Sequence, residues 1–117
     1  MPSSFDVDSV YTQLLAVSDT AAAAGEYEVS YHALMAALHC AESGDDAGRL
    51  ADIARIARER LRSVDAGAPD HRLSSRTAAA HGHRSVYEMG AATAESAVKR
   101  VQSRVRLAEH RRARGPV

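Results

Sequence analysis

Two histidines and two glutamates lie on one face of a predicted helix, where they could bind a metal ion. His32 follows Glu28 by four residues, and His39 precedes Glu42 by three. Imidazole and carboxylate groups are common ligands of transition metals. A di-iron site in a helical bundle, however, needs Glu-x-x-His pairs on two helices, and the sequence contains none. We therefore interpret these histidines as structural or incidental, and we expect no metal and no other cofactor.

Three further residues have reactive side chains. His81 and His83 flank a glycine and could chelate a metal, but we interpret them too as structural or incidental histidines. Cys40 is the single cysteine, so it has no partner for an internal disulfide. Its neighbour His39 points about 100° away on a helix and is poorly placed to activate the thiol. We interpret Cys40 as buried and inert, find no glycine-rich phosphate loop, and expect no enzymatic activity.

The spacing of apolar residues predicts an all-α protein. Apolar side chains recur every three or four residues, which is helical periodicity. The expected helices are residues 6–24, 27–43, 46–65 and 86–112, with Ser3 or Ser4 as the first N-cap and a Ser85/Glu88 capping box before the last helix. The first three should pack as an antiparallel array around a core that comprises Leu14, Leu34, Leu38, Ile53, Ala57 and Leu61.

Apolar residues are unevenly distributed, which suggests three parts. Large apolar side chains number 19 in residues 1–64 and nine in residues 65–117, so the core is expected in the first half. Residues 1–66 are expected to form a three-helix domain, and residues 86–117 a basic C-terminal helical arm. Residues 67–85 contain one large apolar side chain, that of Leu73. We therefore expect this segment to be a linker or a loosely held, alanine-rich helix.

The first hairpin resembles a tetratricopeptide repeat over residues 11–44. Gly25 and Tyr27 open its second helix, and Ala37-Leu38 stand near the end, as in that motif. Ser18 and Ser30 replace the small residues that let the paired helices touch, and the repeat period does not continue beyond the hairpin. The resemblance implies a protein-interaction scaffold. An ordinary antiparallel hairpin with a glycine turn accounts for the same residues.

Charge is segregated along the chain. Residues 1–48 contain eight acidic residues and no lysine or arginine, whereas residues 49–117 contain all 15 basic residues and seven acidic ones. The basic residues of the last segment are Lys99, Arg100, Arg104, Arg106, Arg111, Arg112 and Arg114. Such asymmetry is typical of nucleic-acid contact or of pairing with an acidic surface, although a solvated helix face gives the same pattern.

These features predict a self-associating module for protein–protein interaction. The last helix should dock on the acidic residues 1–48 of its own chain or of a second copy, giving a homodimer, and a small nucleic-acid-associated protein is the alternative. The expected interaction surface comprises Lys99, Arg100, Arg104, Arg106, Arg111, Arg112, Val98, Val101 and Val105. The chain has no recognisable leader and no apolar run long enough to span a membrane, so a cytoplasmic location is expected. Fourteen arginines against one lysine, with 24 alanines, suggest a GC-rich bacterial genome.

Overall fold

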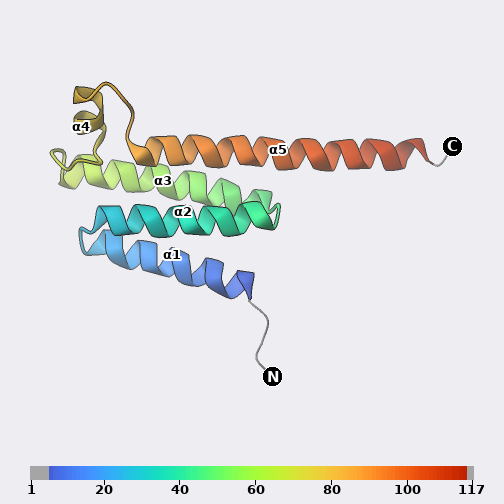
Figure 1. Cartoon of the computed structure of the whole chain (residues 1–117), viewed down its shortest axis with the longest axis horizontal. Coiled ribbons are helices and arrows are strands. Elements are labelled where there is room, and N and C mark those ends of the chain that lie inside the picture. Colours follow the sequence, from blue (N-terminus) through green and yellow to red (C-terminus); the bar gives the residue numbers. More distant parts are fainter. Residues whose placement is uncertain (1–5, 116–117) are drawn as a thin grey trace.

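A computed structural model describes residues 6–115 of the chain, and over that range the regular secondary structure is helical, with turns between the helices. The elements are α1 (Val7–Ala23), α2 (Tyr27–Ser43), α3 (Ala47–Gly67), the short α4 (Ser75–Ala80) and α5 (Val86–Arg114). Figure 1 shows the four long helices side by side in the order α1, α2, α3, α5, with successive helices antiparallel. The prediction of an all-α helical array is confirmed.

The helix boundaries follow from local residue chemistry. The carboxylate of Asp6 accepts hydrogen bonds from the Asp8 and Ser9 amides at 3.1 and 3.3 Å and so caps α1. The predicted caps Ser3 and Ser4 lie outside the described residues. Gly25 has a φ of 78°, a conformation that suits glycine, at the turn between α1 and α2. Asp46 caps α3 by accepting from the Arg49 amide at 3.0 Å.

The core lies between the helices and follows the predicted stripes closely. Of the six residues expected inside, five are buried: Leu34, Leu38, Ile53, Ala57 and Leu61. Leu14 is only half-buried, because α1 is the outer helix of the array and packs chiefly against α2. Tyr11 and Ala21 supply the buried apolar side chains of α1 instead.

The core also extends into the second half of the sequence, where few large apolar residues occur. The first part of α5 buries Tyr87, Ala91, Ala94, Ala97 and Val101 against the rest of the chain. Gly90 is buried as well, and a Cβ atom there would lie 2.8 Å from Cε of Met35 in α2. Alanine and glycine therefore let α5 pack closely, which a count of large side chains does not register.

The connection between α3 and α5 is held to α3 by hydrogen bonds. The Asp65 carboxylate accepts from the Ser75 amide at 2.8 Å and from the Ser75 hydroxyl at 2.7 Å. Ser74 caps α4, and its hydroxyl donates to the Pro69 carbonyl at 2.7 Å. Leu73 is buried in the core. Residues 67–85, expected as a linker or a loosely held helix, thus contain α4 and a series of hydrogen-bonded turns.

Candidate interaction surface

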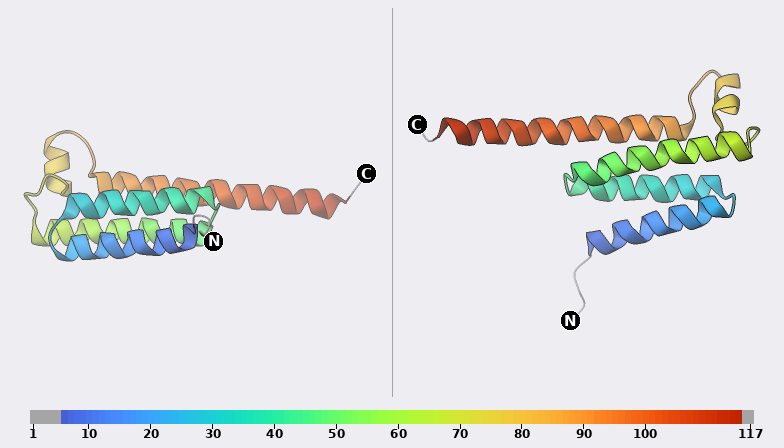
Figure 2. Two further views of the ribbon diagram at one scale, coloured as in Figure 1. Left: turned by 60° about the horizontal axis from the view of Figure 1, so that its bottom comes forward. Right: turned by 180° about the vertical axis from the view of Figure 1, so that it is seen from behind.

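Helix α5 consists of a docked part and a projecting part. Residues 86–101 contain all of its buried side chains, whereas every residue from Gln102 to Arg114 is exposed. Figures 1 and 2 show that this second part runs on straight beyond the turn between α2 and α3. We call residues 102–114 the arm and the rest of the molecule the body.

Tyr87 anchors the docked part of α5. Its ring is fully buried and meets the ring of Tyr31 edge to face at a centroid distance of 5.5 Å. Its hydroxyl donates a hydrogen bond of 2.6 Å to the backbone carbonyl of Tyr27, in the first turn of α2. Burial raises the pKa of the Tyr87 hydroxyl above its usual value of 10.0 and so favours further the neutral form that donates this hydrogen bond.

The start of α5 also differs in one respect from the predicted capping box. Ser85 is the N-cap, as expected, and its hydroxyl oxygen accepts from the Tyr87 amide at 3.3 Å. Glu88 instead contacts Arg58 of α3 at 3.3 Å, and Glu95 contacts the same guanidinium at 2.7 Å. The two glutamates therefore fix α5 along α3, which supplies most of the surface on which α5 docks. Within one chain, the prediction that residues 1–48 provide that surface is wrong, because α3 contributes the apolar stripe against which the small residues of α5 fit, and α2 supplies a smaller part. Docking on residues 1–48 of a second copy stays a prediction.

The acidic and basic halves of the chain are nevertheless joined by ion pairs. Five arginines from the second half reach carboxylates of the first: Arg49–Asp8, Arg60–Asp19, Arg72–Glu28, Arg100–Glu42 and Arg104–Asp45. Single surface ion pairs contribute about 0–1 kcal/mol each, so these pairs orient the helices more than they stabilise them. Much of the charge segregation is thus neutralised within one chain.

The nine predicted surface residues separate into two groups. Four of them face the body: Val101 is 5% exposed, Val98 is half-buried, Arg100 contacts Glu42 at 3.4 Å, and Arg104 contacts Asp45 at 2.6 Å. The remaining five are Lys99, Val105, Arg106, Arg111 and Arg112. All of these except Lys99 lie on the arm. No other helix within residues 6–115 packs against them there.

The arm exposes both charge and apolar surface. Within residues 6–115, no carboxylate lies within 4.0 Å of the guanidinium groups of Arg106, Arg111, Arg112 and Arg114. Val105 and Leu107 are 50% and 51% exposed. Leu107 and Arg114 were not among the predicted surface residues. Leu107 lies off the valine stripe, so periodicity could not identify it, whereas Arg114 belongs to the basic run and could have been included.

No family model, curated protein or solved structure matches the chain.

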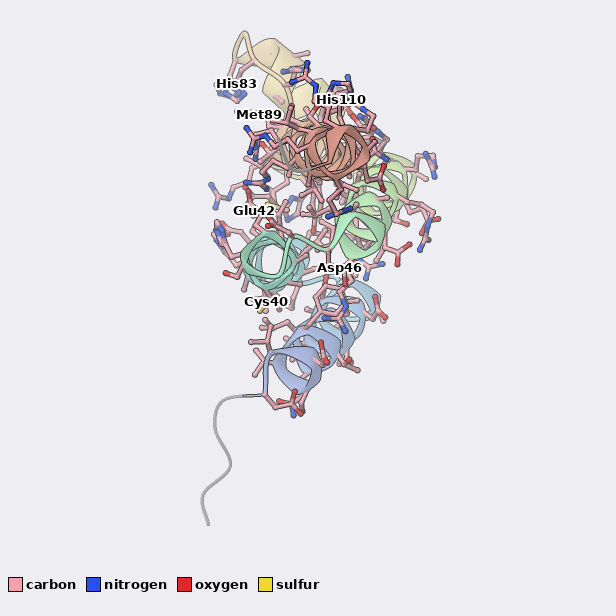
Figure 3. The ribbon with its side chains drawn as sticks, turned by 90° about the vertical axis from the view of Figure 1, so that its right-hand side faces the viewer. Cys40, Glu42, Asp46, His83, Met89 and His110 are labelled. Atoms are coloured by element: carbon pink, nitrogen blue, oxygen red, sulfur yellow. The ribbon has the colours of Figure 1, made fainter. Side chains whose placement is uncertain are left out.

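The residues considered for metal chemistry do not come together in a group of three. Among the described residues, no three histidine, cysteine, aspartate or glutamate side chains converge as a metal site would require. In the histidine–glutamate set, Glu28 pairs with Arg72, and Glu42 contacts both Arg100 and His39. Figure 3 shows Glu42 on the side of α2 toward α5 and Cys40 on the side toward α1. Cys40 is half-buried rather than fully buried.

An open groove runs between α3 and α5. Its volume is about 580 Å³, and its apolar lining includes Ala51, Ala54 and Val98. The rim carries Arg55, Arg58 and Lys99 together with Glu95, and Arg58 and Glu95 pair with each other.

None of the helices in residues 6–115 combines the length and apolar character needed to cross a bilayer.

Proposed function

We propose that this chain is a non-enzymatic, cytoplasmic helical module for protein–protein interaction, and that it self-associates through the arm. The observation that carries the proposal is the projection of the arm: 13 consecutive helical residues, all exposed, held to the body by little more than the Arg104–Asp45 pair. The arm prolongs a helix whose first part is docked, but helices in proteins gain most of their stability from packing, and the arm has none against the body. A partner surface would supply that packing.

The first hairpin supports the same proposal. At the crossing of α1 and α2, the Ser18 hydroxyl oxygen lies 2.9 Å from the Ser30 carbonyl oxygen, and both residues are fully buried. Small residues at this crossing are what the resemblance to a tetratricopeptide repeat requires. Repeats of that kind act as interaction scaffolds, which is the role proposed for this chain.

Removing the arm should convert a dimer into a monomer without unfolding the body. The test compares the full chain with a chain that ends at Val101, using light scattering over a range of concentrations. Because every residue removed from the helix is exposed, circular dichroism should show that the helical body is retained. A full chain that stays monomeric at high concentration would contradict the proposal, and so would a truncated chain that still forms the dimer.

Nucleic-acid binding is the second candidate, and it is favoured by the four arginines of the arm that contact no carboxylate within residues 6–115. The described arm has no phenylalanine, tyrosine or tryptophan side chain on which bases could stack, and its one ring is the imidazole of His110, so binding would depend chiefly on phosphate contacts. We expect such binding to weaken with salt by about 0.9 units of log–log slope for each phosphate contacted. Fluorescence anisotropy with labelled DNA and RNA measures this slope. If neither binds at low salt, this candidate is eliminated.

A further inference from the structure

The body and the arm carry opposite net charges of equal size. Residues 102–114 contain five arginines and one glutamate, and the remaining residues contain 14 acidic and ten basic side chains. The arm therefore has an excess of four positive charges and the body an excess of four negative ones. Since α5 continues straight past the body, these charges cannot meet within one chain except through Arg104.

An acidic surface lies at the base of the arm. Glu42, Asp45 and Asp46 surround the turn between α2 and α3, and we call these three residues the acidic corner. The corner already binds guanidinium groups, because Glu42 holds Arg100, Asp45 holds Arg104, and Asp46 contacts the guanidinium of Arg49 at 3.6 Å. The side chains of Asp45 and Asp46 remain 59% and 44% exposed, so further cations can approach them.

The arm also continues the apolar face that α5 presents to the body. Val101 is buried against the body, and Val105 and Ala108 follow it at spacings of four and three, on the same side of the helix. Helix α3 begins at Ala47, beside the last docked turn of α5, so it does not extend along this part of the arm. The face of Val105 and Ala108 is left without a helix to pack against.

We infer that this position is filled by the arm of a second copy, antiparallel to the first and related to it by a two-fold axis. This inference rests on the proposed self-association and names the surfaces that meet. The arm is about 20 Å long at 1.5 Å per residue. In this arrangement the two arms cross near Ala108. The side chains of Arg111, Arg112 and Arg114 of one copy then lie level with residues 102–105 of the other copy. That level is where the other copy's acidic corner lies, and each contact occurs twice by symmetry.

The first experiment tests the charge contact in the full chain. Arg111→Glu and Arg112→Glu together should weaken dimerisation at least tenfold, because they place two negative charges against the acidic corner. The matched control is Arg62→Glu with Arg84→Glu, which changes the net charge equally at two exposed arginines outside the arm. This control should dimerise as the unmodified chain does. Equal effects of the two pairs would overturn the inference.

The second experiment tests the antiparallel geometry. With Cys40→Ser as background, Ala108→Cys should form an intermolecular disulfide when the protein is treated with oxidised glutathione, because the two thiols meet at the crossing point. His110→Cys is the control, because residue 110 lies on the opposite side of α5 from the body (Figure 3) and should react far less.

The outcomes separate the inference from the proposal on which it rests. A monomeric chain, whether or not it binds labelled nucleic acid, would overturn both. A dimer in which Ala108→Cys and His110→Cys react equally, or in which the Arg111 and Arg112 reversals have no effect, would leave self-association standing and overturn the antiparallel pairing of the arms.

Discussion

Leu38→Ala should lower the free energy of unfolding by about 2–5 kcal/mol, which is the usual range for truncating a buried leucine. Leu38 is 2% exposed and belongs to the cluster that joins α2, α3 and α5. The substitution removes apolar contacts and leaves a cavity that the surrounding backbone can close only in part. Urea denaturation followed by circular dichroism gives the change in unfolding free energy.

A matched truncation on the surface separates burial from the loss of side-chain atoms alone. Val17→Ala on α1 removes methyl groups from a side chain that is 49% exposed and should have little effect on the same measurement. A near-zero change for Leu38→Ala would show that the buried stripe of α2 has been assigned to the wrong residues.

Tyr87→Ala should lower the free energy of unfolding by about 3–5 kcal/mol, because it removes the largest fully buried side chain within residues 6–115 and with it the anchor of α5. Tyr87→Phe keeps the ring against Tyr31 and loses only the hydrogen bond to the Tyr27 carbonyl. It should cost about 0.5–1.5 kcal/mol. If the two substitutions destabilised the protein equally, the hydroxyl would be the anchor and the packing of the ring would contribute nothing.

Much of the fold could be predicted because its signals are local. Apolar spacing located the first three helices, Gly25 located the first turn, and Ser85 located the start of α5. The docking of α5 could not be predicted in the same way. Its contact surface consists largely of alanines around Gly90, and the value of small side chains depends on how closely another helix approaches.

The candidate surface could be predicted only in part, for a related reason. The valine stripe and the arginine run continue through α5 without interruption, so the sequence does not mark the residue at which the body ends. In the sequence pattern, Val101 therefore looks the same as Val105, although Val101 is buried and Val105 is exposed. In the same way Arg104 looks the same as Arg111, although Arg104 contacts Asp45 of the body. The carboxylates that hold Arg100 and Arg104 lie nearly 60 residues away in the chain, and spacing carries no information on such pairs.

Because the four long helices lie side by side in a single row, they differ in how easily each can detach from the rest of the molecule. Helices α2 and α3 each lie between two neighbours, whereas α1 lies at an edge and buries only Tyr11, Ser18 and Ala21. Local openings are easiest where the fewest contacts are lost. Helix α1 can therefore detach while α2, α3 and α5 stay packed, once Arg49 and Arg60 release Asp8 and Asp19. The molecule would then present a second apolar face, on α2, at the edge farthest from the arm.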